Sequence, residues 1–401
     1  MKIGIYFILF LSITFISKSQ DFVWTSDFSK NIGKLDDIFF YNSNEGLMVE
    51  EKLGFALTGN GGVEWGSGMI SKSYKHNALF LIKPIYAFVV SANNETKKGA
   101  FFSTSSKGLS WIKSDHEFEN PLMQLFFFDA DNGIVLDDKN NLYITSDRGQ
   151  TFSSIYSFPV RINEFGFFAD KLWAVGDNGS IFFSIDNATS WVSVTIQSEE
   201  NINSIEILEN GDVFLCGDNG FVAKSSNEGE TWEIIKKGKV DLNSIDFFDE
   251  DHGIVIGGEE NVGVCYMTED GGDSWISESV PDAEYLDVEY LSKDIVVGVG
   301  LYHESVDFSY GYIIYGEKAT SIQEIDNSNT ILYPNPASDR VTICGYGDAR
   351  IEVLNNVGQV VLLADYVFGE YLDISDLNTG VYYCRIITKN RVEIKLLNVL
   401  N

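Results

Sequence analysis

Short apolar stretches alternate with polar turns along most of the chain, and no long helical periodicity interrupts them. In residues 126–134, three phenylalanines lead into a polar turn closed by Gly, and the same arrangement recurs at 245–254 and more loosely at 38–46. Apolar runs bounded by Asp, Asn and Gly are typical of β-strands joined by tight turns. The pattern predicts an all-β protein whose repeating inner strands begin near residues 36, 77, 122, 162, 202, 242 and 284.

An eight-residue turn motif recurs in phase with these strands. Each copy begins with Thr or Ser and ends on Trp or Phe, and the copies occupy residues 58–65, 104–111, 145–152, 184–191, 225–232 and 268–275. Their final aromatic residues lie 46, 41, 39, 41 and 43 residues apart. A period near 40 residues is typical of one four-stranded blade of a β-propeller.

The third residue of the motif is Asp, Asn or Ser, whose side chain can accept hydrogen bonds from the amides of its own turn. The fifth residue is usually Gly, which tolerates a positive φ where the hairpin reverses. The motif resembles the Asp-box (bacterial neuraminidase) repeat, in which these residues have a structural role. The resemblance therefore implies a structural role for Asn60, Ser106, Asp147, Asp186, Asn227 and Asp270.

The inner strands predict seven blades, with six or eight as alternatives. The last blade, roughly residues 284–316, lacks both the motif and the aromatic strand after it, and residues 22–25 have the pattern of that strand. An N-terminal strand that closes the ring would remove an open sheet edge. We therefore expect a seven-bladed β-propeller over residues 20–316, followed by a linker at 317–330 and a small Ig-like β-sandwich at 331–401.

The first residues resemble a signal peptide. Lys2 precedes an apolar stretch, and small residues at positions 17 and 19 favour cleavage before Gln20. A signal peptide at 1–19 is predicted, and a retained membrane anchor is the alternative because the stretch is short for a bilayer span. We expect no integral membrane segment after cleavage.

The last 70 or so residues contain Tyr333-Pro334-Asn335-Pro336 and, before the penultimate strand, Gly380 and Tyr382. These motifs resemble the type A C-terminal sorting domain of the type IX secretion system of Bacteroidota. The resemblance implies export by the type IX machinery, which would recognise residues 331–401. It also implies a secreted protein, or one attached to the outer membrane of a Gram-negative cell. An ordinary accessory sandwich is the alternative.

Net charge is −31, and it is unevenly distributed. Residues 326–401 hold nine acidic and six basic residues and the leader holds two lysines, which leaves −30 in residues 21–325. Such a surface repels nucleic acid, so we expect no nucleic-acid partner. The cysteines and histidines are scattered, so no metal and no cofactor is predicted. A disulfide between Cys344 and Cys384 stays open.

Asp-box propellers include sialidases, which hold the substrate carboxylate with three arginines. Residues 21–325 contain only Arg148 and Arg161, which argues against that activity. The repeat over about residues 22–316 also resembles the photosystem II stability/assembly factor family. Those assembly factors use a basic patch that this acidic chain lacks, so the resemblance implies the fold and not a photosynthetic role. Residues 129–133 and 249–253 begin like calcium loops but lack the downstream Glu, so we interpret them as hairpin turns.

We therefore predict no catalytic residues and a non-enzymatic propeller that binds an extracellular protein or glycan. The alternatives are a glycoside hydrolase with an acidic pair and an envelope assembly factor. The expected binding face lies opposite the Asp boxes, where turns between second and third strands meet a longer aromatic loop at 301–310. Its candidate residues are Asp138, Asp177, Asn178, Asp218, Asn219, Glu259, Glu260, Tyr302, His303, Phe308 and Tyr310.

Overall fold

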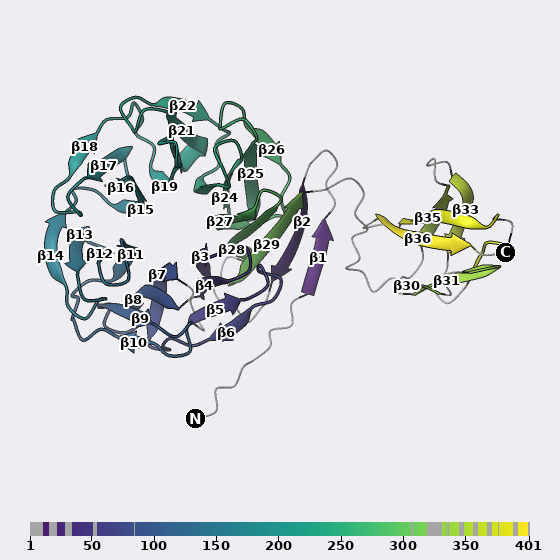
Figure 1. Cartoon of the computed structure of the whole chain (residues 1–401), viewed down its shortest axis with the longest axis horizontal. Helices are drawn as coiled ribbons and strands as arrows, with labels where there is room; N and C mark the ends of the chain where they lie inside the picture. Colours follow the sequence, from purple (N-terminus) through teal and green to yellow (C-terminus); the bar gives the residue numbers. More distant parts are fainter. Residues whose placement is uncertain are drawn as a thin grey trace. The chain divides into compact units, whose positions relative to one another are not determined.

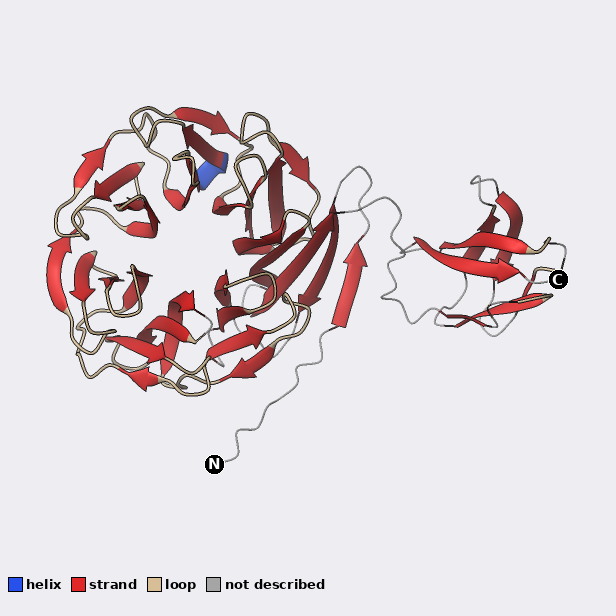
Figure 2. Ribbon diagram, viewed as in Figure 1, coloured by secondary structure: helices blue, strands red, loops and turns tan. Residues whose placement is uncertain are grey.

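A computed structural model of the chain describes residues 11–15, 22–28, 34–50, 54–83, 85–305, 308–318, 331–333, 335, 337–344, 349–355, 360–366, 371–375, 377–387 and 392–399. The chain forms two compact units, Met1–Lys318 and Ala319–Asn401. Strands dominate both, and η1 (Asp218–Gly220) is a single turn of 3-10 helix (Figure 2).

The first unit is the predicted seven-bladed propeller (Figure 1). The innermost strands of its blades begin at or within three residues of the predicted positions. They are β3 (Leu35–Phe40), β7 (Tyr74–Lys83), β11 (Leu122–Phe127), β15 (Ile162–Phe168), β19 (Ile202–Ile207), β23 (Leu242–Phe247) and β27 (Glu284–Ser292). The second strands are β4 (Gly46–Glu50), β8 (Tyr86–Asn93), β12 (Gly133–Asp137), β16 (Lys171–Gly176), β20 (Val213–Gly217), β24 (Gly253–Glu259) and β28 (Ile295–Ser305).

The outer half of each blade is built from two further antiparallel strands. The third strands are β5 (Gly54–Thr58), β9 (Gly99–Thr104), β13 (Asn141–Thr145), β17 (Ser180–Ser184), β21 (Phe221–Ser225), β25 (Val262–Thr268) and β29 (Phe308–Lys318). The outermost strands are β6 (Gly66–Gly68), β10 (Ile112–Lys113), β14 (Ser153–Ser157), β18 (Val192–Val194), β22 (Glu233–Lys236), β26 (Ile276–Glu278) and, from the N-terminus, β2 (Phe22–Phe28).

The N-terminal strand closes the ring as predicted. β2 pairs antiparallel with β29, which puts Trp24 opposite Gly316. Trp24 is 2% exposed, and a Cβ added to Gly316 would lie 2.6 Å from its ring. The glycine therefore makes room for the indole. A further strand, β1 (Leu11–Phe15), pairs with β2 and lies inside the segment predicted as a signal peptide.

The hydrophobic core lies between successive blades. One buried cluster joins Trp173 and Val175 of β16 to Ile205, Val213 and Leu215 of the next blade. Because both faces of the blade pack in this way, second strands such as β12 and β20 are buried along their whole length. Their continuous apolar runs, rather than alternation, reflect that burial.

Two predicted boundaries need correction. Residues 301–305 and 308–310 form no loop, because the first range belongs to β28 and the second to β29, and Tyr302 pairs with Tyr310. Aromatic residues favour extended strands, and here they extend the hairpin of the seventh blade. β29 also runs to Lys318, so its last two residues fall in the segment predicted as a linker.

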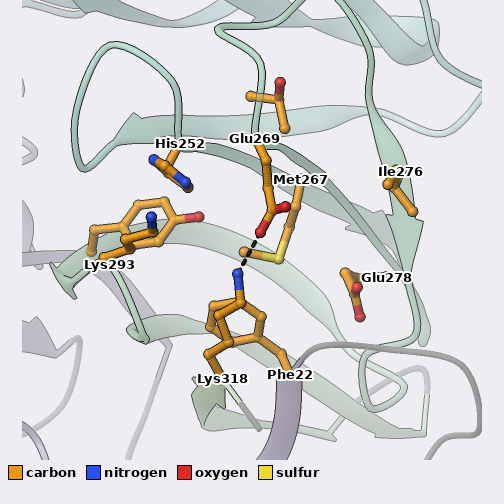
Figure 3. Close-up of a pocket in the computed structure, with 10 residues that line it drawn as sticks. Phe22, His252, Met267, Glu269, Ile276, Glu278, Lys293 and Lys318 are labelled. Atoms are coloured by element: carbon orange, nitrogen blue, oxygen red, sulfur yellow. Dashed lines mark hydrogen bonds and ion pairs between the residues drawn. The ribbon is translucent and has the colours of Figure 1, made fainter. Parts of the chain in front are cut away.

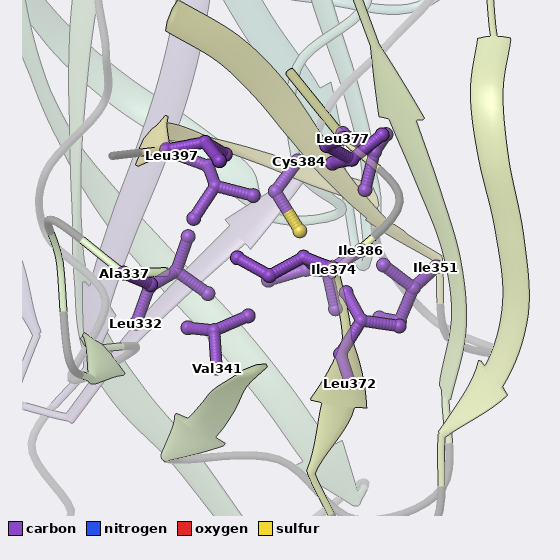
Figure 4. Packing of buried hydrophobic residues seen from close by; sticks show 12 residues of the cluster. Leu332, Ala337, Val341, Ile351, Leu372, Ile374, Leu377, Cys384, Ile386 and Leu397 are labelled. Atoms are coloured by element: carbon purple, nitrogen blue, oxygen red, sulfur yellow. The ribbon is translucent and has the colours of Figure 1, made fainter. Parts of the chain in front are cut away.

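The second unit has two small sheets that share one core (Figure 4). One sheet contains β30 (Ile331–Tyr333), β31 (Arg340–Cys344) and β34 (Leu372–Asp373). The other contains β33 (Val360–Tyr366), β32 (Ala349–Leu354), β35 (Gly380–Ile387) and β36 (Val392–Val399). Cys384 is a free thiol in this core, so it forms no bridge to Cys344. The Ig-like topology stays a prediction.

Candidate functional site

The Asp-box residues are occupied by their own turns. Asp186 accepts hydrogen bonds from Ser184 Oγ at 2.8 Å and from Ser190, through its backbone N–H at 2.9 Å and its Oγ at 2.6 Å. The bonds from Ser190 are the main cause that lowers the pKa of Asp186 to about 2. Asp147 and Asp270 make the same three contacts and have lowered pKa values. The corresponding side chains of Asn60, Ser106 and Asn227 accept the backbone N–H four residues on.

On the predicted binding face, the aspartates of the second turns hold neighbouring strands together. Asp218 accepts hydrogen bonds from Asn201 Nδ2 at 2.7 Å and from Asn203 Nδ2 at 2.9 Å. Asp177 accepts one from Asn163 Nδ2 at 3.3 Å. These aspartates are half-buried, so little of each carboxylate is left for a ligand.

The exposed residues of that face project from the tips of the same turns. Asn178, Asn219 and Glu260 have φ values of 59°, 55° and 53°, and all three are exposed, as is Glu259. Asn219 Nδ2 donates to Glu200 Oε2 at 2.7 Å. Asp138 is exposed as well and pairs with Lys139 at 3.4 Å. The structure thus spreads these residues over four blades, with no shared hydrogen bond among them in the described part.

The aromatic part of that face lies on the extended hairpin of the seventh blade. Tyr302 is 37% exposed and stacks on Tyr312 with ring centroids 6.1 Å apart. His303 Nε2 lies 2.8 Å from Glu284 Oε2, and the His303 backbone N–H donates to Asn261 Oδ1. The side chains of Phe308 and Tyr310 lie outside the described residues.

Polar side chains on the inner strands form a second candidate site that sequence reasoning missed. Each inner strand leaves one edge unpaired, and side chains from the preceding blade bind that edge. Backbone N–H groups donate across the blades from Leu79 to Asp37 at 2.9 Å, and from Ile205 to Glu164 at 2.7 Å. Ser204 and Ser244 accept equivalent bonds, and the side chains of Asn163, Asn203 and Asn243 donate to carbonyls of the following blade.

A signal for this inner rim was present in the sequence. Asn stands directly before a side-chain acceptor at 163–164, 203–204 and 243–244, in strands that alternate these polar residues with apolar ones. Polar groups repeated in phase on buried strands need hydrogen-bond partners. Since the unpaired edge of the next blade supplies those partners, the repeat could have been identified as a blade-to-blade connection.

Burial raises the pKa of six carboxyls on the inner rim. It raises that of Glu164 to about 8 and that of Asp246 to about 6. The pKa values of the others are raised first by burial, and in most of them also by repulsion from neighbouring rim carboxylates. These are Asp37, Glu206, Asp287 and Glu289.

A hollow of about 420 Å³ lies beside the closing strand, lined by Phe22 of β2 and by residues of the sixth and seventh blades (Figure 3). His252, Lys293 and Lys318 line it, and Lys318 forms an ion pair with Glu269. That bond is the main cause of the lowered pKa of Glu269. Lys318 therefore joins the end of β29 to the sixth blade.

The Arg148 guanidinium pairs with Asp131 at 2.8 Å and stacks over the Tyr86 ring at 4.6 Å, while Arg161 is an exposed residue. No group of three or more His, Cys, Asp or Glu side chains in the described part could hold a metal ion. Within that part, no helix has the length and apolar character needed to cross a bilayer.

Two family models match the chain in separate regions. Residues 81–261 match the photosynthesis system II assembly factor YCF48, and residues 331–399 match the secretion system C-terminal sorting domain. A curated relative, the photosystem II assembly lipoprotein Ycf48 of Prochlorococcus marinus (strain MIT 9313), is 24% identical over 151 residues. That match covers 36% of this chain and 45% of the relative, so the chain spans less than half of its length.

Solved structures with the same fold include YCF48 bound to D1 peptide, with a TM-score of 0.58 and 14% identity over 74% of this chain and 97% of that one. YCF48 from Cyanidioschyzon merolae has a TM-score of 0.57 and 13% identity over 73% and 98% of the two chains. The GH74 enzyme of Niastella koreensis has a TM-score of 0.56 and 11% identity over 95% and 75%. At such identities the likeness concerns the fold alone.

The match at 331–399 indicates a secreted or cell-surface protein. The match at 81–261 covers three complete blades and parts of two others, including the Asp-box turns of Ser106, Asp147, Asp186 and Asn227. The chain is an Asp-box β-propeller similar to the photosystem II assembly factor family, joined to a type IX secretion C-terminal sorting domain.

Proposed function

We propose that the propeller is a non-catalytic binding module that works outside the cell and recognises a segment of a partner protein. The type IX machinery would export it through residues 331–401 after a signal peptide at 1–19 directs it to the periplasm. The observation that carries the proposal is the state of the acids. Asp186, Asp218 and Glu164 each accept hydrogen bonds within the fold, which supports a structural role for these three acids rather than activation of water.

A protein ligand is favoured over a glycan. One structure with the same fold carries a bound peptide by its name, and the acidic surface of this chain suits a basic partner. An envelope assembly factor is the second candidate, and the name of the matched family favours it. The binding module and the assembly factor would both bind a protein saturably without turning over a substrate.

The test is a binding screen of the purified full-length chain against envelope and extracellular proteins, with a panel of chromogenic glycosides and a glycan array beside it. We expect saturable capture of one or a few proteins and no glycoside turnover. Turnover that is lost when a single acid is replaced would instead identify a hydrolase. Capture of glycans alone would identify the ligand as a carbohydrate. The variants N178A, N219A and E260Q would then test whether it binds at the predicted face.

A further inference from the structure

Seven side chains form a belt around the propeller axis, toward the end where the first strand of each blade turns into the second. The Asp-box turns lie at that same end, because backbone N–H groups of Arg148 and Gly271 donate to carbonyls of the first turns. The belt side chains lie on the innermost strands, and each keeps part of its surface open to water. They are Phe39, Phe80, Phe126, Phe167, Glu206, Asp246 and Glu289.

Blades one to four supply an apolar arc. The rings of Phe39 and Phe80 lie 5.9 Å apart, those of Phe80 and Phe126 lie 5.1 Å apart, and those of Phe126 and Phe167 lie 5.6 Å apart. Phe128 extends the arc at 5.5 Å from Phe167. Phe167 is 39% exposed, so the arc presents aromatic surface to water. Contiguous exposed aromatic surface of this kind marks interaction sites.

Blades five to seven supply an acidic arc. Asp246 accepts the backbone N–H of Tyr290 at 2.5 Å, and Glu289 accepts that of Phe40 at 3.4 Å. Glu206 is partly buried and accepts no hydrogen bond from any described residue. Burial, followed by repulsion from Asp246 and Glu164, raises the pKa of Glu206 well above its usual value. Because the carboxyl keeps part of its surface open to water, it can accept hydrogen bonds from a donor that a ligand brings.

The acidic arc also lacks a counter-charge. Among the described residues, the groups that act electrostatically on Glu206, Asp246 and Glu289 are carboxyls, and no lysine, arginine or histidine pairs with them. Asp37, Glu164 and Asp287 add three more carboxyls to the same rim. Burial and mutual repulsion favour the protonated form of such carboxyls, whereas a nearby cation favours the ionised form.

We propose that this belt is the recognition site and that it binds a partner peptide in which a lysine or arginine side chain stands beside an apolar one. The cation would lie against Glu206 and Asp246, and the apolar neighbour against Phe126 and Phe167. A bare metal ion fits poorly, because no described cluster has the geometry to hold one and half of the belt is aromatic. The inference rests on the proposed function and gives its ligand a chemical class.

Binding at this belt is coupled to protonation. Because burial raises the pKa values of Glu206, Asp246 and Glu289, a bound lysine or arginine would favour their carboxylate forms and release a proton to water. Affinity should therefore fall as pH decreases. For one selected peptide we expect the Kd to be at least about tenfold higher at pH 5.5 than at pH 8. Calorimetry in two buffers should detect the released proton.

The experiment is selection of a random dodecapeptide phage library on the full-length chain, with the most enriched peptide then synthesised and titrated. We expect enrichment of Lys or Arg next to Phe, Leu, Ile or Trp. E206Q should weaken the peptide about tenfold by removing one charge without removing a hydrogen bond. F167S should weaken it severalfold by removing exposed apolar contact. Fluorescence melting of each variant checks that the propeller still folds.

The matched controls are E233Q, an exposed acid on the outermost strand β22, and I185S, an exposed apolar residue outside the belt. Neither should change the affinity. Selected peptides that lack a basic residue, or that bind wild type and E206Q equally, would overturn the proposal for the belt. Loss of binding in E260Q alone, the variant on the predicted face, would do the same. Each of these outcomes would still be compatible with a non-catalytic binding protein. Equal competition by spermidine would reassign the site to free polyamines. No enrichment together with no captured protein would overturn both proposals.

Discussion

The Asp287 carboxylate accepts the backbone N–H of Ile38 at 3.0 Å, although 249 residues separate them in the chain. This bond joins the seventh blade to the first at the inner rim, as β2 joins them at the outer side. Asp37, beside Ile38, is in turn repelled by Asp287 and accepts the N–H of Leu79 in the second blade. The contacts that complete the ring are therefore also the ones that crowd carboxyls around its axis.

This crowding predicts an unusual pH dependence of stability. Unfolded carboxyls have pKa values near 4, whereas the six rim carboxyls have raised values in the folded state. The unfolded chain then releases protons more readily, so stability falls as pH rises from about 4 until the folded groups have also ionised, near 8 for Glu164. The melting temperature followed by tryptophan fluorescence should decrease from pH 4.5 to pH 8.5. All seven tryptophans lie in the propeller, so the signal reports this unit.

The Asp-box acids act in the opposite direction and in a lower range. Their pKa values are lowered, to about 2 for Asp186, so their contribution is lost only as pH falls below about 4. E164Q keeps an acceptor for the Ile205 N–H and should flatten the decline between pH 6 and pH 8.5. D138N, on the exposed turn, should leave the curve unchanged. A melting temperature that rises steadily to pH 8 would contradict the interpretation of the rim.

The Asp-box turn makes a sharp steric prediction at Gly229. Its φ is +85°, and a Cβ there would lie 2.4 Å from Cη2 of Trp173 in the preceding blade. G229A should therefore destabilise the propeller by about 2 kcal/mol, because both backbone strain and overpacking oppose it. Urea unfolding at constant pH measures this.

The matched position in the fourth blade provides the control. Ala188 occupies the same place in its turn with φ of 66°, and it packs in a cluster with Ile134, which is smaller than the indole of Trp173. A188G should relieve the strained backbone while opening a small gap, and its effect should stay below about 1 kcal/mol. Equal losses in both variants would show that the aromatic neighbour is not what requires glycine.

The blade count, the turn motif and the closing strand could all be predicted because their physics is local. Asp186 binds its own turn, and Trp24 lies in a strand whose apolar pattern completes a defective blade. The inner rim could not be predicted in the same way. The partner of Asp287 is a backbone group of another blade, and only the closed ring brings Ile38 to it. The prediction of a loop at 301–310 was wrong for a related reason. The pairing of Tyr302 with Tyr310 depends on the strand register, which the aromatic pattern alone does not give.

Ring closure itself can be tested at Trp24. Its side chain is almost fully buried and stacks near Phe22, with ring centroids 5.9 Å apart. W24A should cost about 3–5 kcal/mol through lost contacts and the cavity left behind. V262A, at a residue 58% exposed at the start of β25, should cost less than about 0.5 kcal/mol. Unfolding in urea followed by circular dichroism would measure both, and a small loss in W24A would argue that β2 contributes little to closure.

The sorting tail has one residue that joins its opening motif to its final strand. Asn335 Nδ2 donates to the Leu396 carbonyl at 2.7 Å, and Asn335 Oδ1 accepts the Asn398 N–H at 2.9 Å. An amide is required for this pair because it must donate and accept at once, so N335D should lose the donor half and N335A both halves. If the export machinery recognises the folded tail, the amount of protein in the medium or on the cell surface should fall in the order wild type, N335D, N335A. V381T, at an exposed position of β35, should be exported normally. Normal export of N335A, with a tail that still resists proteolysis, would mean that the pairing serves neither folding nor recognition, and that the machinery recognises another part of residues 331–401.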